Sequence, residues 1–268
     1  MGAAHEVSAL RQMLAGLEAE RLPGASSSFS FGASGPDAAL ANTLARGALH
    51  EVYAAQSADM PAAAGFALAL ALRASGDARP IVWVRQDFLD TEAGRLDAHG
   101  LIALGLDPSR LILVRARDPE QALRAAGDAV RCAALGAVLL EPWGEPKAFD
   151  LTATRRLALR AGVSGVTLFL LRMVAKPSAS VAVTRWLVRP AISTPLAADA
   201  PGAPAFTATL QRHRGGIQGH QWNLEWDHER CSFRDIATLS RTVVPVPAGG
   251  SAGQSEAPAQ ISAFRRAG

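Results

Sequence analysis

The sequence contains few cysteines and few lysines. Its two cysteines, Cys132 and Cys231, lie far apart and belong to no Cys-x-x-Cys or Cys/His cluster. This spacing argues against a disulfide scaffold and a zinc site, and two reduced thiols are typical of a cytoplasmic protein. Of the 27 basic residues, only Lys147 and Lys176 are lysines. A GC-rich coding bias explains this arginine excess better than selection for phosphate binding does.

Long apolar runs and a strong net charge are also lacking. The longest apolar run, 61–72, is about twelve residues long, which is too short to span a bilayer. Charged side chains interrupt residues 1–22, so these do not form the apolar stretch of a signal peptide. The net charge of +3 is too small to indicate nucleic-acid binding by itself. We therefore expect a cytoplasmic protein without a membrane partner.

The middle of the chain alternates between apolar strand-like segments and helical ones. The predicted strands are 48–54, 80–86, 111–116, 136–143 and 165–172, and the predicted helices are 62–76, 96–107, 119–135 and 150–162. This alternation is typical of a parallel sheet with helices on both faces. Beyond Pro177, the segments 180–190, 205–214 and 220–227 alternate as antiparallel strands do. We therefore predict an α/β fold whose parallel central sheet is extended by antiparallel strands.

The two ends of the chain differ from this middle part. Residues 1–22 predict an amphipathic helix, whose apolar stripe is formed by Val7, Leu10, Leu14 and Leu17. A lone helix of this length is marginal in water, so the stripe must be buried against the core or a neighbouring molecule. The Gly/Ser-rich segment 23–37 predicts a flexible linker. The core then spans 38–244, and 245–268 is predicted to be a disordered tail.

The turn after the first core strand is where parallel-sheet proteins bind phosphates. A Walker A loop needs Gly-x-x-x-x-Gly-Lys-Ser/Thr, so that backbone amides, a lysine and a hydroxyl surround phosphate and magnesium. In this chain those four positions hold Ala54, Asp59, Met60 and Pro61. An aspartate repels phosphate, and proline removes an amide donor. We therefore predict no cofactor in this loop.

Several ordered segments carry a family resemblance. LARGALHEVYA (44–54) resembles the entry into the nucleotide core of the recombinase RecA. Together with IVWVRQD, GLDPSRLILVRARD, DLTATRRLAL and NLEWDHERCSF, it resembles the inducible mutagenesis protein A family, ImuA, over about 5–235. The resemblance implies a RecA-like core and an accessory role in SOS-induced translesion DNA synthesis. The implied partners are RecA, an inactive Y-family polymerase homologue and an error-prone C-family DNA polymerase.

The RecA pattern also suggests positions for catalytic carboxylates. Asp87 follows the second core strand and Glu141 ends a later one, where RecA-like enzymes hold a general base and a metal-binding acid. Without the phosphate loop, we favour ordinary polar residues at strand ends. The six histidines show no metal-ligand spacing, and no nucleophile pattern is present. We predict no metal site and no confident catalytic residue.

Two further segments are candidate contact sites. Arg212 and Arg214 match two lysines that, in the resembling RecA segment, reach a neighbouring subunit's nucleotide; they are either phosphate contacts, to ATP or DNA, or solvated charges. In the tail, Gln260, Ile261 and Phe264 resemble a sliding-clamp-binding peptide, although Ala263 fills the second leucine position poorly. The sliding clamp and DNA are therefore additional candidate partners.

Two other functions remain open from the sequence. A weak or DNA-stimulated ATPase would use Asp87, Glu141 and the arginines without a Walker lysine. A cell-division inhibitor of the SulA kind is also a degenerate RecA relative, but such chains resemble only a trimmed core. The non-catalytic accessory protein is the reading we favour.

Overall fold

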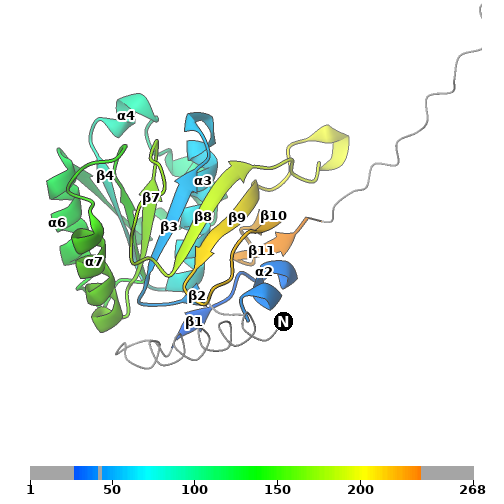
Figure 1. The fold of residues 1–268 in the computed structure, drawn as a ribbon. Helices are drawn as coiled ribbons and strands as arrows, with labels where there is room; N and C mark the ends of the chain where they lie inside the picture. Colours follow the sequence, from blue (N-terminus) through cyan, green and yellow to red (C-terminus); the bar gives the residue numbers. More distant parts are fainter. Residues whose placement is uncertain (1–26, 42–43, 237–268) are drawn as a thin grey trace, which may run out of the picture. The chain divides into compact units, whose positions relative to one another are not determined.

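The computed structural model describes residues 27–41 and 44–236, and a nine-stranded sheet runs through them (Figure 1). The strand order is β11-β10-β9-β8-β3-β7-β6-β4-β5. These strands are β3 Leu49–Ala54, β4 Ile81–Gln86, β5 Leu111–Ala116, β6 Ala137–Glu141, β7 Thr167–Arg172, β8 Thr184–Pro190, β9 Ala205–His213, β10 His220–Asp227 and β11 Ser232–Asp235. A small second sheet pairs β1 Ser28–Phe29 with β2 Leu44–Ala45.

The parallel part of the sheet comprises β8, β3, β7, β6, β4 and β5. Every residue of β3, β4, β6 and β7 is buried. Such continuous burial requires cover on both faces, and helices provide it. The predicted fold class, a parallel sheet extended by antiparallel strands, is confirmed.

Helix α3 (Met60–Ser75) covers one face, and α6 (Pro119–Ala129) with α7 (Leu151–Ser164) covers the other. The carboxylates of Asp118 and Asp150 cap α6 and α7 by accepting from the amides of Gln121 (2.6 Å) and Ala153 (2.7 Å). Gly76 ends α3 with a φ of 64°, which glycine adopts without strain. These local signals fix where α6 and α7 start and where α3 stops.

The direction of β8 differs from the expectation. The segment 180–190 was expected to be one of a set of antiparallel strands, but β8 runs parallel to β3 and antiparallel only to β9. Residues 173–183, which form no helix, carry the chain past β3 from β7 to β8. Side-chain alternation reports burial on one face and carries no information on strand direction.

The predicted linker 23–37 is wrong over its described part, 27–37. Phe31 is fully buried, with its ring 5.4 Å from that of Trp186 and 5.3 Å from that of Phe233. The buried Asp37 carboxylate accepts from the amides of Phe31 (2.7 Å) and Gly32 (2.8 Å). A six-residue helix, α2 (Ser34–Ala39), follows. Apolar burial and these hydrogen bonds fix a segment whose composition suggested flexibility.

Other boundaries shift as well. The predicted helix 96–107 is reduced to α5 (Ala98–Ala103), preceded by the one-turn α4 (Leu89–Glu92), and β11 was not anticipated. The packed core therefore begins before residue 38 and is described as far as Ile236. The predicted helix within 1–22 and the tail 245–268, with its clamp-like peptide, lie outside the described residues. Within the described part, no helix combines the length and apolar character needed to cross a bilayer.

His50 on β3 gives a testable pH dependence. Its Nε2–H donates to the Ala45 carbonyl (2.9 Å), its Nδ1 accepts from the Thr184 hydroxyl (2.8 Å), and burial lowers its pKa to about 4. The folded protein keeps His50 neutral, whereas the unfolded chain takes up a proton below about pH 6.5. The contribution of the neutral His50 to the free energy of unfolding is therefore complete above pH 6.5 and is lost as the pH falls toward 4.

Between pH 7 and pH 5, we expect the free energy of unfolding of His50→Gln to fall by about 2 kcal/mol less than that of the wild type, as measured by urea denaturation. Other titrating groups are common to both proteins and cancel in the comparison. Identical pH slopes for the two proteins would show that His50 is not held neutral.

Candidate functional site

The turn between β3 and α3 leads directly from strand to helix. After Ala54, a single 3₁₀ turn (Ser57–Asp59) closes with a hydrogen bond from the Asp59 amide to the Gln56 carbonyl (2.9 Å). Asp59 is buried at the amino end of α3, its carboxylate caps no amide, and its Oδ2 has no partner among the described residues. Pro61 supplies no amide in the first helical turn. A buried carboxylate therefore occupies the helix end at which an anion would be bound.

Glu141, at the carboxyl end of β6, is buried in an ion pair. Its Oε2 accepts from the Arg85 Nε–H (3.0 Å) and from the Trp83 indole N–H (2.9 Å). Arg85 and Glu141 are register partners on the adjacent parallel strands β4 and β6. Burial raises the pKa of Glu141, and the nearby Arg85 opposes that rise. The carboxylate is thus neutralised by a side chain of the sheet itself.

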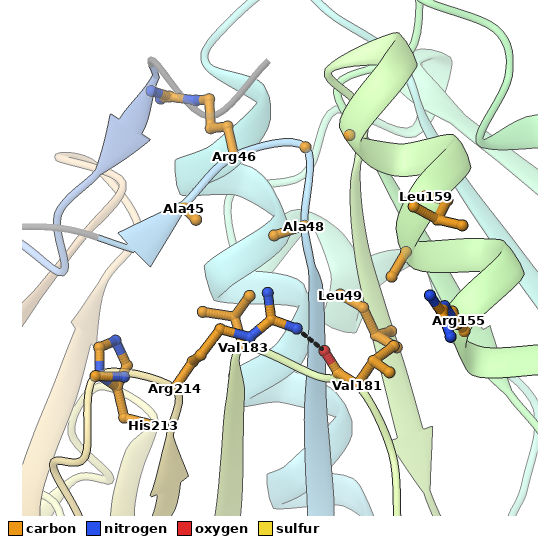
Figure 2. A pocket seen from close by; sticks show the side chains of 14 residues that line it. Ala45, Arg46, Ala48, Leu49, Arg155, Leu159, Val181, Val183, His213 and Arg214 are labelled. Atoms are coloured by element: carbon orange, nitrogen blue, oxygen red, sulfur yellow. Dashed lines mark hydrogen bonds between the residues drawn. The ribbon is translucent and has the colours of Figure 1, made fainter. Parts of the chain in front are cut away.

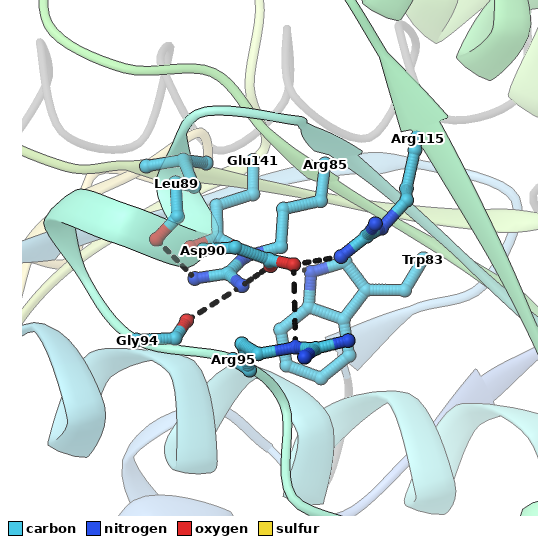
Figure 3. A network of polar contacts seen from close by, with 8 residues as sticks. All are labelled: Trp83, Arg85, Leu89, Asp90, Gly94, Arg95, Arg115 and Glu141. Carbon is cyan, nitrogen blue, oxygen red and sulfur yellow. Dashed lines mark hydrogen bonds and ion pairs between the residues drawn. The ribbon is translucent and has the colours of Figure 1, made fainter.

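Arg85 joins this pair to the segment that follows β4 (Figure 3). Its guanidinium also donates to the Asp90 carboxylate (2.9 Å) and the Gly94 carbonyl (2.8 Å). Asp90 in turn contacts Arg115 of β5 and, at 3.7 Å, Arg95. The network spans three neighbouring strands and holds the 89–95 segment over their carboxyl ends.

A cavity of about 240 Å³ lies beside this network, lined in part by Met60, Pro61, Trp83 and Glu141. It is smaller than the pockets that usually enclose a small-molecule ligand. In the part of the chain that the structure describes, no group of His, Cys, Asp or Glu side chains is arranged to hold a metal ion.

Asp87 differs from Glu141 although it lies near the end of the adjacent strand. Its side chain is exposed, and its amide donates to the Ala116 carbonyl (2.8 Å). Asp87 therefore lies in the surface loop after β4, while Glu141 is enclosed. The roles that the RecA pattern suggests for the two carboxylates stay predictions.

Arg212 and Arg214 lie at the opposite end of the sheet from the β3–α3 turn. Arg212 pairs in register with Arg185 near the start of β8, whereas Ala54 pairs with Val188 further along that strand. The Arg212 guanidinium donates to the Ser180 carbonyl (2.9 Å), and that of the exposed Arg214 donates to the Val181 carbonyl (3.2 Å). Both side chains hold the segment leading into β8 and keep other N–H groups for a ligand. Their role as phosphate contacts stays a prediction.

Sequence reasoning did not find the two buried ion pairs of the sheet. Besides Arg85–Glu141, the buried Glu51 of β3 accepts from Arg185 Nε of β8 (2.9 Å). The signal was a charged residue inside an otherwise apolar strand, as in IVWVRQ and HEVYA. Such a residue must be paired when the strand is buried on both faces, but the sequence does not say with which partner.

Comparison with known proteins gives the family. No protein-family model matches the chain. Protein ImuA from two strains of Caulobacter vibrioides is 35% identical over 214 residues, which cover 74% of this chain and 83% of that protein. The chain belongs to the ImuA family.

A solved structure supports the fold. The crystal structure of the RadB recombinase matches this chain with a TM-score of 0.52 and 18% identity, covering 78% of this chain and 100% of that one. At that identity, the likeness shows the fold alone. The expected RecA-like core is therefore confirmed, while the roles of individual residues are not addressed by it.

A double-mutant cycle tests the buried pair. Arg85→Met should lower the free energy of unfolding by about 3–5 kcal/mol, because it leaves Glu141 charged, buried and unpaired. Adding Glu141→Leu should recover at least about 1 kcal/mol of that loss. The matched control is Arg95→Met, since the Arg95 side chain is 80% exposed and should contribute at most about 1 kcal/mol. Urea denaturation of the wild type, the Arg85→Met and Glu141→Leu single variants and the double variant completes the cycle, and strictly additive losses would contradict the pairing.

Proposed function

We propose that this member of the ImuA family is a non-catalytic, RecA-fold accessory protein of SOS-induced translesion synthesis, and that it acts by docking to partners. The proposal rests on the carboxyl ends of the parallel strands, where the β3–α3 turn and Glu141 lie and where RecA-like enzymes hold their nucleotide. We call this the nucleotide end of the sheet, and the protein's own side chains occupy it. Asp59 is buried at the start of α3, and Glu141 is neutralised by Arg85.

Electrostatics favours this reading over a residual ATPase. An ATP phosphate at the β3–α3 turn would meet the Asp59 carboxylate in a low-dielectric setting, where like charges repel strongly. A magnesium ion would have to displace Arg85 from Glu141, and breaking a buried ion pair costs about 3–5 kcal/mol. Asp87 alone, exposed in its loop, supplies neither a phosphate cradle nor a second metal ligand.

The proposed partners are RecA, the inactive Y-family polymerase homologue and the error-prone C-family DNA polymerase. The sliding clamp, through Gln260, Ile261 and Phe264, and DNA are additional candidates. The two ends of the sheet support one-sided docking. Arg212 and Arg214 can offer N–H donors to a phosphate held by a neighbour, while the other end has no equivalent site to offer in return. The protein would then bind the terminal subunit of a RecA filament without extending it.

ATP binding is the first test. We expect isothermal titration of the purified chain with Mg-ATP to give no binding at micromolar concentrations, because Asp59 and Pro61 oppose a phosphate at the turn. A micromolar Kd that Met60→Glu abolishes would contradict the proposal, since it would show that the turn does hold phosphate.

The arginine pair gives a second and independent test. Charge-assisted contacts contribute about 1.5–3 kcal/mol each, so Arg212→Ala with Arg214→Ala should weaken ATP-dependent binding to RecA filaments by well over tenfold. The matched control changes Arg117 and Arg131 to Ala; both are exposed and outside the ion pairs of the described residues. Co-sedimentation with and without ATP measures the effect, and thermal melting checks the fold. Equal binding by both double variants would leave Arg212 and Arg214 as surface charges.

A further inference from the structure

A groove opens at the amino-terminal end of β3, between α7 and the end of β9 (Figure 2). Its volume is about 370 Å³, and ten of its fourteen lining residues are Ala, Gly, Leu or Val. The other four are Arg46, Arg155, His213 and Arg214, which Figure 2 places around the apolar residues. The Arg46 guanidinium donates to the carbonyls of Ser28, Arg73 and Ala74, so the positive charge at the rim comes from Arg155 and Arg214. The groove therefore combines an apolar floor with a basic rim, and it is distinct from the β3–α3 turn.

The apolar surface continues from the groove along α7. Leu159, which lines the groove, is 51% exposed, and Val163, one turn further along the helix, is 82% exposed. Residues four apart lie side by side on a helix surface, so the two form one exposed aliphatic strip. Neither Arg155 nor Arg214 forms an ion pair with the described residues. Exposed apolar area bordered by unpaired cations indicates a docking surface.

The chain itself brings a candidate occupant to this groove. Ser27, where the description begins, accepts a hydrogen bond through its carbonyl from the Arg46 amide (2.9 Å), and Arg46 lines the groove. Residue 22 is five residues before Ser27, so the chain between them spans at most about 18 Å. The amphipathic segment 5–22 is therefore tethered at the rim and is present at high effective concentration.

The pattern of that segment matches the groove. Its stripe of Val7, Leu10, Leu14 and Leu17 covers about 15 Å of helix, and a stripe of this kind needs an apolar surface. Glu6 and Glu18 lie on either side of the stripe in a helix, where they can face the unpaired arginines of the rim. The apolar stripe and the charges of segment 5–22 therefore match the apolar floor and the arginines of the groove, and its tether is short enough to reach them.

We propose that residues 5–22 dock as an amphipathic helix in this groove of their own chain, packing against Leu159 and Val163 beside Arg155 and Arg214. The docked helix lies next to the end of the sheet that carries Arg214 and covers part of it. This self-docking requires none of the partners named above, and it holds or fails independently of them.

Limited trypsin digestion tests the docking, because Arg11 and Arg21 lie within the segment. A released helix of this length is only marginally stable and is cleaved quickly. We expect Leu159→Glu to raise the initial rate of cleavage after Arg11, followed by mass spectrometry, at least tenfold. The matched control is Leu151→Glu, on the same helix with the same exposure (50%) but outside the groove, and it should change the rate less than twofold.

A variant on the other side of the contact completes the test. Leu14→Glu should raise the rate of cleavage by a similar factor. Combining it with Leu159→Glu should add little, because both substitutions remove the same contact. Equal cleavage of the wild type, Leu159→Glu and Leu14→Glu would overturn the proposal. Circular dichroism of each variant confirms that the core is folded.

The dependence of cleavage on protein concentration distinguishes docking of the segment in its own chain from docking in the groove of a second copy. Docking within one chain predicts cleavage rates that do not change over a hundredfold dilution and a monomeric mass by light scattering. Protection that is lost on dilution would place the segment on another molecule and would overturn docking in its own chain.

Discussion

The structure depends on how a sheet buried on both faces accommodates charge. Helix α3 on one side and α6 with α7 on the other keep water from the central strands, so a carboxylate there needs a counter-ion inside the sheet. Two carboxylates have one: Glu141 pairs with Arg85, and Glu51 pairs with Arg185. Each pair joins neighbouring strands at one register position. Position along a strand therefore decides whether a carboxylate is buried in an ion pair, as Glu141 is, or exposed in the following loop, as Asp87 is.

This constraint separates the two ends of the sheet. At the carboxyl ends of β4 and β6, polar groups satisfy one another, and the 89–95 segment is held over them by Arg85 and Asp90. At the opposite end, the side chains of Arg155 and Arg214 have no carboxylate partner among the described residues and border an apolar groove. The first end has little left to offer a ligand, and the second has both charge and apolar area available.

Much of this fold could be predicted from the sequence. The strands with continuous apolar burial lie where the pattern indicates, and α3, α6 and α7 begin within two residues of their predicted starts. The segment 27–37 could not be predicted in this way, because its Gly and Ser composition outweighed Phe29 and Phe31, whose burial depends on distant residues such as Trp186 and Phe233. The candidate site could be predicted from the sequence only in part. Sequence shows which phosphate-binding residues are missing, but the contact between Arg85 and Glu141 joins residues 56 positions apart, and pairing at that separation is set by strand order.

The pairing of Glu141 with Arg85 also means that restoring the phosphate loop alone would not free this carboxylate for a metal ion. A chain that acquired glycines and a lysine at the β3–α3 turn would still hold a carboxylate whose charge is taken up by Arg85. Removing Arg85 first would leave that carboxylate buried without a counter-ion and would release the 89–95 segment, so the fold would weaken before any nucleotide chemistry appeared. Changes at the turn alone therefore leave this carboxylate engaged, and removal of Arg85 lowers the stability of the fold. The Arg85–Glu141 pair thus links the stability of the sheet to the engagement of this carboxylate.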